Sequence, residues 1–317
     1  MPSVLITRPL PDRVVAAARA RFDVELRADT RPMSPDEMIA ALRGHDAVLP
    51  TLGDMFRAEV FAAVPAPRCR LLANFGVGYN HIDVAAARAA DIAVTNTPGA
   101  VTDATADIAL TLMLMCARRA GEGERMLRAG RWEGWHPTQM LGLHMTGKRV
   151  GIIGMGRIGK AIARRCHHGF GMEVVFYNRS PVEDPGVPAR QVTDLADAMD
   201  ADVVVVAVPG GPATHHLIGR DALAAMRPRG ILVNIARGDV VDEAALIAAL
   251  EAGAIGGAGL DVYEFEPKVP AALIAREDVV LLPHLGTAAL EVREAMGLMA
   301  VANLVAFFDG AALPNPV

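Results

Sequence analysis

The stretch GIIGMGRIGKAIAR, residues 151–164, decides the fold. It contains a G-x-G-x-x-G motif, formed by Gly154, Gly156 and Gly159, with an apolar strand pattern before it and a helical pattern after it. The first glycine allows a tight turn, the second lets the backbone approach a pyrophosphate, and the third permits close packing of the helix on the strand. Because such an anion meets the amide groups at the start of the helix, the motif predicts a dinucleotide-binding unit.

Short apolar runs on both sides of this motif indicate two units of the same kind. In the first hundred residues the candidate strands are VLIT (4–7), FDVEL (22–26), AVLP (47–50), RLLAN (70–74) and IAVTN (92–96). From residue 148 onward they are KRVGIIG, MEVVFYN, ADVVVVAVP, GILVNIA, AIGGAGLDV and DVVLLPH. Since helical patterns separate these runs, we expect an α/β protein with two doubly wound parallel-sheet domains.

Two long helical patterns mark the domain boundaries. One begins after NTPGAV, where Thr102 or Asp103 is a candidate cap. The other spans residues 287–310, carries apolar residues at helical spacing and ends at Gly310. We expect this C-terminal helix to pack on the first unit. The predicted domains are therefore residues 1–98 plus 288–317, and residues 99–287.

Composition excludes several classes of function. The net charge is −5 and no basic cluster is present, so nothing favours nucleic acid as a partner. No apolar run approaches the roughly 20 residues of a membrane span, and the N-terminus does not resemble a signal peptide. Cys69, Cys116 and Cys166 are far apart in apolar contexts, as reduced thiols of a cytosolic protein are. We therefore expect a cytoplasmic protein without a membrane partner.

The histidine pairs do not predict a metal site. His167 and His168 are adjacent in a helical pattern, where neighbouring side chains point apart. His215 and His216 lie in a predicted loop, and no His or Cys cluster has zinc-like spacing. We therefore expect no metal.

The end of the strand after the glycine motif bears on the choice of cofactor. An NAD-binding chain places an acidic residue about 20 residues beyond the motif, where it binds the ribose 2′-hydroxyl. Here Asn178 occupies that place, followed by Arg179 and Ser180. Asn178 removes the repulsion of a 2′-phosphate, which the arginine and the hydroxyl can bind. The residues favour NADPH, and the alternative is a solvated arginine in an enzyme indifferent to the phosphate.

Three polar residues follow strands of the second unit. Arg237 lies in NIARGDVVDE, Glu266 in GLDVYEFEP and His284 in LLPHLGTA. Each alone has an ordinary structural explanation, but ligands of such folds bind at the carboxyl ends of the strands, where the three can converge. Histidine ionises near neutral pH, and a carboxylate beside it favours the imidazolium and orients the ring. The three residues are therefore candidate catalytic residues.

These motifs together carry a family resemblance. The segments NFGVGYNHID, TNTPG, GIIGMGRIG, NIARGDVVDE, GLDVYEFEP and LLPHLGT span nearly the whole chain. The chain resembles the D-isomer-specific 2-hydroxyacid dehydrogenase family, and within it the glyoxylate/hydroxypyruvate reductases. The resemblance implies a flavodoxin-like substrate domain and a Rossmann nucleotide-binding domain with a cleft between them.

The resemblance also implies roles for individual residues. Arg237 would bind the substrate carboxylate and the C2 oxygen, His284 would protonate that oxygen, and Glu266 would hold His284. The amides of Val77 and Gly78 would receive the substrate carboxylate, and Trp135 would reach the active site of a partner subunit. Asp261 would bond the nicotinamide carboxamide. The remaining implied cofactor contacts are Thr105, Gly154, Gly156, Arg157, Ile158, Gly159, Asn178, Arg179, Ser180, Val208, Pro209, Thr214, Ile235, Ala236, Arg237, His284 and Gly286.

The expected function is therefore the NADPH-preferring reduction of glyoxylate or hydroxypyruvate to D-2-hydroxy acids by a homodimer, with NADH as a weaker cofactor. Two alternatives stay open. A phosphoglycerate-type dehydrogenase would prefer an acid at position 178 and often carries a further regulatory domain. A nucleotide-sensing protein like the family's corepressors can keep the complete set of Arg237, Glu266 and His284.

Overall fold

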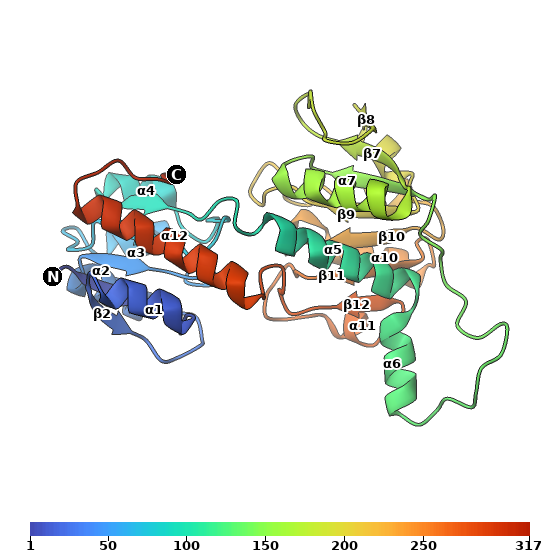
Figure 1. The fold of residues 1–317 in the computed structure, drawn as a ribbon, viewed down its shortest axis with the longest axis horizontal. Coiled ribbons are helices and arrows are strands. Elements are labelled where there is room, and N and C mark those ends of the chain that lie inside the picture. The colour runs from blue at the N-terminus through green and yellow to red at the C-terminus, as the bar shows by residue number, and fades with distance from the viewer. The chain divides into compact units, whose positions relative to one another are not determined.

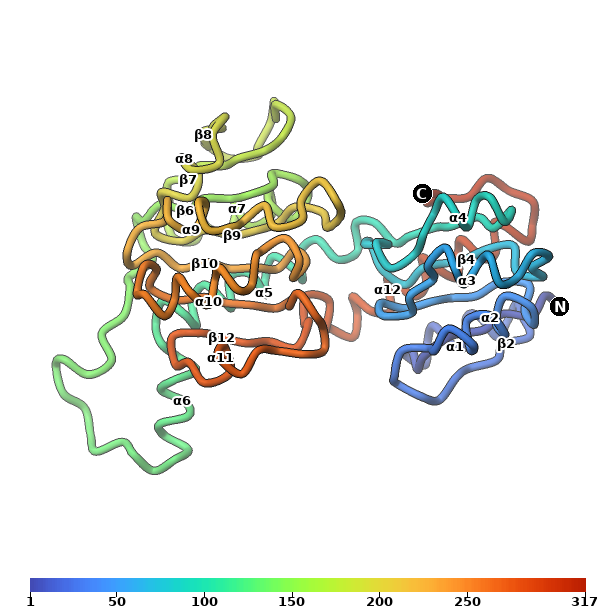
Figure 2. The backbone as a smooth tube through the Cα atoms, turned by 180° about the vertical axis from the view of Figure 1, so that it is seen from behind, coloured from blue at the N-terminus to red at the C-terminus, as the bar shows by residue number.

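The computed structural model describes every residue from Met1 to Val317, and these residues form two units. The first unit consists of Met1–Val101 and Ala288–Val317, and the second of Thr102–Thr287. Each unit is one parallel sheet with helices on both faces (Figures 1 and 2). No helix combines the length and the apolar composition that crossing a membrane requires.

The first unit has a five-stranded parallel sheet in the order β2-β1-β3-β4-β5, which is the flavodoxin-like order. Its elements are β1 (Ser3–Ile6), α1 (Asp12–Arg19), β2 (Asp23–Leu26), α2 (Pro35–Gly44), β3 (Ala47–Leu49), α3 (Ala58–Ala62), β4 (Leu71–Ala73), α4 (Val84–Ala89), β5 (Ala93–Thr95) and α12 (Leu290–Phe308). All five predicted strands of this unit are confirmed.

Helices cover the two faces of this sheet in separate groups. The helices α1 and α12 lie on one face, and α2, α3 and α4 lie on the other (Figures 1 and 2). A Cβ at Gly297 of α12 would lie 2.4 Å from a methyl group of Val14, so the glycine lets α12 pack tightly on α1. The helix ends at Phe308, and Gly310 follows with φ +70°, as a glycine after a helix end commonly does.

The second unit has a seven-stranded parallel sheet in the order β12-β11-β10-β9-β6-β7-β8. Read from β8, its own strands run 3-2-1-4-5-6-7, which is the Rossmann order with one strand added. Its elements are α5 (Thr102–Ala117), α6 (Ala120–Arg128), β6 (Arg149–Ile153), α7 (Arg157–Phe170), β7 (Glu173–Tyr177), β8 (Ala189–Val192), α8 (Leu195–Met199), β9 (Val203–Val206), α9 (Arg220–Ala224), β10 (Ile231–Asn234), a 3₁₀ turn (Gly238–Val240), α10 (Glu243–Glu251), β11 (Gly257–Leu260), α11 (Ala271–Ile274) and β12 (Val279–Leu281).

The layers of the second unit explain its sequence pattern. The helices α5 and α7 cover one face of the sheet, and α8 to α11 cover the other (Figures 1 and 2). Every residue of β9 is therefore buried, which accounts for its run of four valines. The six predicted strands are confirmed, but the edge strand β8 was not expected. The helix α5 begins at Thr102, so both predicted capping residues lie in its first turn.

One segment leaves the body of the second unit. Residues 129–148, between α6 and β6, contain no helix or strand and run out and back beside α6 (Figure 1). Trp132, Trp135 and Leu141 in this segment are exposed.

Candidate active site

The glycine motif forms a tight turn between β6 and α7. Gly154 has φ +102°, and a Cβ there would lie 2.8 Å from the carbonyl oxygen of Ala207. A Cβ at Gly159 would lie 2.1 Å from the carbonyl oxygen of Gly154, so only glycine lets the helix approach the turn. A Cβ at Gly156 would meet no atom within 4 Å. The first and third glycines thus serve packing, while the second opens onto free space.

The start of α7 can bind an anion at that free space. No side chain caps the helix at Gly156, and the amides of Gly156, Arg157 and Ile158 donate to no protein acceptor. Amides at a helix N-terminus, together with the helix dipole, favour a bound phosphate. The turn and the helix start therefore fit the pyrophosphate of a dinucleotide.

The end of β7 lies beside this turn. The side-chain oxygen of Asn178 accepts a hydrogen bond from Met155 N at 3.2 Å, and its amide nitrogen donates to the carbonyl of Ser180 at 2.8 Å. Arg179 and Ser180 are exposed, and Arg179 forms no ion pair. The corner therefore offers a cation without a protein counter-charge and contains no carboxylate at the predicted position.

The other predicted cofactor residues follow β9 and β10. Thr214 donates its hydroxyl hydrogen bond to the carbonyl of Pro209 at 2.7 Å, which folds the loop after β9 back on itself. Val208 is half-buried in the same loop. Ile235 and Ala236, which directly follow β10, are buried, with 6% of each exposed. These residues come from neighbouring strand ends at the carboxyl edge of the sheet.

His284 and Glu266 form the central pair of the candidate site. Nδ1 of His284 lies 2.9 Å from Oε2 of Glu266, and the two side chains are 29% and 33% exposed. His284 has φ +54°, a left-handed conformation that is uncommon outside glycine and points to a constrained position. The two side chains therefore lie within hydrogen-bonding distance, while their catalytic roles stay predictions.

The environment of Glu266 keeps it ionised. Burial alone would raise the pKa of Glu266, but the hydrogen bond and charge of His284, the amide of Tyr263 and the charge of Arg237 together lower the pKa below its ordinary value. Glu266 is therefore a carboxylate at neutral pH.

Arg237 follows β10 and is half-buried. Burial lowers its pKa, and the charges of Glu266 and Asp239 oppose that shift. The guanidinium still stays protonated at neutral pH, because arginine ionises far above it. The structure thus places a fixed cation within the electrostatic reach of Glu266.

Two glycines that the sequence did not single out permit close contacts beside Arg237 and Tyr263. A Cβ at Gly210 would lie 2.6 Å from Cγ of Arg237, and a Cβ at Gly238 would lie 1.8 Å from the carbonyl carbon of Tyr263. Tyr263 in turn donates its hydroxyl to the carbonyl of Leu282 at 2.9 Å and its amide to Glu266. No local signal marks these residues, because their reason is contact between strand ends far apart in sequence.

Asp261 and Thr105 hold the segment that carries His284. The two carboxylate oxygens of Asp261 accept hydrogen bonds from Leu285 N at 2.6 Å and Gly286 N at 2.8 Å. Thr105 is buried and donates to the carbonyl of Gly286 at 3.2 Å. Burial raises the pKa of Asp261 despite these amides. Asp261 and Thr105 therefore fix the backbone after His284. Their predicted contacts with the cofactor stay predictions.

In the first unit, the segment after β4 presents two amides without partners. The side chain of Asn74 binds the carbonyls of Gly76 and Gly78, each at 3.0 Å, and Asn96 binds the carbonyl of Val77 at 2.9 Å. The amides of Val77 and Gly78 donate to no protein acceptor. The loop thus has its carbonyls fixed and two N–H groups available for an anion.

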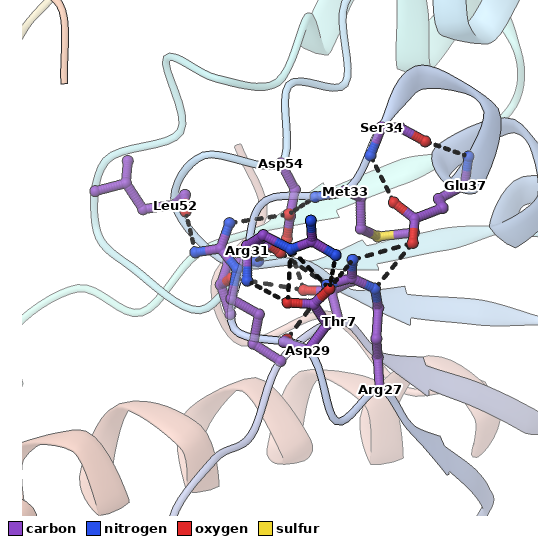
Figure 3. Close-up of polar contacts among 11 residues, drawn as sticks. Thr7, Arg27, Asp29, Arg31, Met33, Ser34, Glu37, Leu52 and Asp54 are labelled. Carbon is purple, nitrogen blue, oxygen red and sulfur yellow. Dashed lines mark hydrogen bonds and ion pairs between the residues drawn. The ribbon is translucent and has the colours of Figure 1, made fainter. Parts of the chain in front are cut away.

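A buried carboxylate fixes the neighbouring loop of the same unit. Figure 3 shows Asp54, which is fully buried and accepts hydrogen bonds from the Thr7 hydroxyl at 2.6 Å and Met33 N at 3.0 Å. Arg8 forms an ion pair with it at 3.2 Å. These contacts link the ends of β1 and β3, where the strand order of this sheet reverses and where ligands of such sheets bind.

The histidine pairs differ in what surrounds them. The rings of His167 and His168, at the end of α7, have centroids 5.0 Å apart. The rings of His215 and His216 stack with centroids 3.9 Å apart, and Nε2 of His216 lies 2.8 Å from Oε1 of Glu264. Trp135 lies in the protruding segment and is 78% exposed.

Known proteins are similar to this chain along its length. A family model for the "D-isomer specific 2-hydroxyacid dehydrogenase, NAD binding domain" matches residues 110–286. A glyoxylate reductase of Thermococcus kodakarensis is 43% identical, over 100% of this chain and 96% of that protein. A glycerate dehydrogenase of Hyphomicrobium methylovorum is 37% identical, over 97% of this chain and 96% of that protein. The structure of an NADPH-dependent glyoxylate/hydroxypyruvate reductase from Sinorhizobium meliloti, in complex with NADP and malonate, matches with a TM-score of 0.88 and 37% identity, covering 100% of this chain and 96% of the other.

Proposed function

Because the chain belongs to the D-isomer-specific 2-hydroxyacid dehydrogenase family, an oxidoreductase family with a nicotinamide dinucleotide domain, we propose that it reduces glyoxylate or hydroxypyruvate to the D-2-hydroxy acid. The observation that carries this proposal is the pair of His284 and Glu266, 2.9 Å apart, with the cation of Arg237 nearby. The names of the relatives support the substrate class, since glyoxylate reductases match the whole chain.

Each residue of the site has a task in the proposed reaction. The Arg237 guanidinium binds the substrate carboxylate and draws electron density toward the C2 oxygen. A bound reduced nicotinamide supplies the hydride to C2. Glu266 occupies Nδ1 of His284, so Nε2 is the atom that holds the proton for the C2 oxygen. The ionised Glu266 favours the imidazolium before transfer, and its hydrogen bond keeps the ring oriented.

The amides of Val77 and Gly78 are the proposed ligands for the substrate carboxylate on the first unit. They support this role because they have no protein acceptor, while Asn74 and Asn96 hold the carbonyls of the same loop. Backbone N–H groups that converge in a loop form anion-binding sites in many proteins.

NADPH is the proposed cofactor, with NADH bound more weakly. The open space at Gly156 and the free amides at the start of α7 would hold the pyrophosphate. Arg179 and Ser180 would bind the 2′-phosphate, and Asn178 adds no charge that would repel it. An enzyme indifferent to the phosphate is the alternative, and NADPH and NADH compared on one preparation distinguish the two.

A homodimer is proposed from the protruding segment. Trp132 is 51% exposed, Trp135 78% and Leu141 65%, and none of α6 is buried. Large apolar side chains gathered on a protruding segment are typical of a surface that another protein covers. Trp135 is proposed to reach the active site of the partner subunit, so Trp135→Ala should raise KM for the keto acid more than KM for NADPH.

Steady-state kinetics test the proposed function directly. Glyoxylate, hydroxypyruvate and bulkier 2-keto acids are compared with NADPH and NADH, and D-3-phosphoglycerate oxidation is measured beside them. His284→Ala should lower kcat by about 10²–10⁴-fold, the usual contribution of a positioned acid, with little change in NADPH binding. Turnover of phosphoglycerate alone would favour the phosphoglycerate-type alternative. Cofactor binding without any turnover would favour the corepressor-like one.

A further inference from the structure

We propose that His215, His216 and Glu264 form a site for one divalent transition-metal cation of the Zn²⁺ or Ni²⁺ class. The site is distinct from the residues assigned to the reduction, and its existence does not depend on the proposed function. Two imidazoles and one carboxylate are ligands that such cations take, and they leave room for water as the remaining ligand.

The geometry of the three side chains is close to what a metal requires. One possible ligand atom from each residue lies within 4.8 Å of the other two. Ligand atoms around a tetrahedral ion with bonds of about 2.1 Å lie about 3.4 Å apart. A pair at the 4.8 Å limit would have to approach by about 1.4 Å, which a rotation of the exposed His215 ring can supply.

The backbone places both imidazoles on the same side. Successive side chains usually point apart, but His216 has φ +51°, and its amide donates to the carbonyl of Asp239 at 2.8 Å. This bend stacks the two rings at a centroid distance of 3.9 Å, beside the carboxylate of Glu264. His216 thus holds a left-handed conformation that few residues other than glycine adopt. As a result, both imidazoles lie on the same side of the backbone and can bind one ion.

The charges around the cluster favour a cation. Glu264 and Glu243 face each other, and the backbone amide of each lies 3.4 Å from a carboxylate oxygen of the other. Glu243 is buried, and neither carboxylate forms an ion pair with a lysine or arginine. Of the two carboxylates, Glu264 has one ionisable partner, His216, and Glu243 forms no ion pair. A divalent ion bound to Glu264 would balance both charges.

The ion would join two segments of the second unit. His215 and His216 belong to the loop after β9, which also carries Val208 and Thr214. Glu264 lies in the segment after β11, two residues before Glu266. Because a ligand held by both segments stabilises the state in which they are together, metal should slow hydrogen exchange in residues 209–218.

The chain contains its own control. His167 and His168 are also adjacent histidines, but their rings lie edge to face at 5.0 Å, and no third ligand joins them. The double variant His167→Ala, His168→Ala removes two imidazoles, the same number as His215 and His216 contribute, and leaves the proposed site unchanged.

The experiment is calorimetric titration of Zn²⁺ into EDTA-treated protein that carries no polyhistidine tag, without substrate or cofactor. Wild-type protein and the control variant should each bind one ion. His215→Ala and Glu264→Gln should each weaken binding by at least about tenfold, the lower bound for losing a supporting residue of a metal site. Co²⁺ should show visible absorption bands that both variants lose, and Zn²⁺ should slow exchange in residues 209–218 of the wild type.

The proposal is overturned if wild-type protein binds no ion, if the control variant loses the site, or if His215→Ala binds Zn²⁺ as the wild type does. Because His215 is exposed, that variant separates metal binding from folding, and its thermal unfolding without metal should match the wild type. Since no turnover is measured, failure of the metal site and failure of the proposed reductase function remain distinguishable.

Discussion

Arg179 stands at the end of β7 with no carboxylate near enough to pair with it. If it binds the 2′-phosphate, Arg179→Ala removes a hydrogen bond to a charged group, which contributes about 1.5–3 kcal/mol. NADPH should then bind roughly tenfold to 150-fold more weakly, while NADH changes little. Fluorescence titration with both cofactors measures this. Arg190→Ala, at an exposed arginine of β8, is the control, and an equal loss for both cofactors would remove Arg179 from phosphate binding.

Glu266 leads to a prediction about pH. Because His284 and other neighbours lower its pKa below the ordinary 4.5, Glu266 stays ionised at neutral pH, and the pairing is lost only as the pH falls through that lowered value. Reduction needs the protonated imidazole, so kcat/KM should fall on the alkaline side, while oxidation of the hydroxy acid should gain there.

The variant Glu266→Gln keeps the shape of the side chain and removes the negative charge that favours the imidazolium. The alkaline limb of kcat/KM for reduction should therefore move to lower pH. The full pH profiles of wild type and variant give the measurement. A limb that stays in place would show that Glu266 does not control protonation of His284.

At the level of single residues, the sequence predicted site residues from their positions at strand ends and from their chemistry. Arg237, Glu266 and His284 were predicted as site residues because they follow strands whose ends meet at one edge of a sheet. Gly210 and Gly238 were missed, because an added Cβ would clash with atoms 27 and 25 positions away in the chain, in Arg237 and Tyr263. Such contacts exist only once the strands have assembled.

At the level of the element, two glycines of the turn between β6 and α7 should respond differently to substitution by alanine. An alanine at Gly156, whose φ is −78°, meets no protein atom within 4 Å, so Gly156→Ala should fold normally and bind the dinucleotide at least about tenfold more weakly. An alanine at Gly159 would lie 2.1 Å from the carbonyl oxygen of Gly154, so Gly159→Ala should lower the stability itself, by about 1–3 kcal/mol.

Thermal unfolding and cofactor titration of both variants separate these effects. Gly169→Ala is the control, because Gly169 lies in α7 and a Cβ there also meets nothing within 4 Å. If Gly156→Ala binds the cofactor normally, the pyrophosphate does not lie against this glycine.

Among the elements, buried strands were predictable and the exposed edge strand was not. A strand such as β9, with all its residues buried, consists of one uninterrupted apolar run. The edge strand β8 reads Ala-Arg-Gln-Val, and only its valine is buried. A short polar run of this kind has the pattern of a loop until a neighbouring strand, here β7, supplies its hydrogen bonds.

For the molecule as a whole, the exposed segment predicts association. The wild type should be a dimer in sedimentation equilibrium. The double variant Trp132→Ser, Leu141→Ser should raise the dissociation constant of the dimer at least about 30-fold, because a buried tryptophan at an interface typically contributes 2 kcal/mol or more. Leu290→Ser is the control, because Leu290 is as exposed as Leu141 but lies on α12. A wild-type monomer would contradict the proposed dimer.

Side-chain clusters whose members come from distant parts of the chain could not be predicted from the sequence. The prediction of no metal was based on ligand spacing along the chain, and it stays a prediction beside the proposed site. His216 and Glu264 are 48 positions apart, yet their side chains meet at 2.8 Å. The hydrogen bonds of Asp54 likewise join residues from three separate loops of the first unit, and the sequence of no single loop predicts them.

The hydrogen bonds of Asn178 bear on how coenzyme choice can evolve. Its side-chain oxygen accepts from Met155 N, and an aspartate of the same shape would keep that bond but could not donate to the carbonyl of Ser180. Asparagine and aspartate codons differ by one nucleotide, so the step is open to ordinary mutation. The corner also lies on a different strand from those that carry Arg237 and His284. A lineage could therefore exchange its electron donor, and with it the metabolic pool it draws on, while inheriting the same chemistry at the substrate.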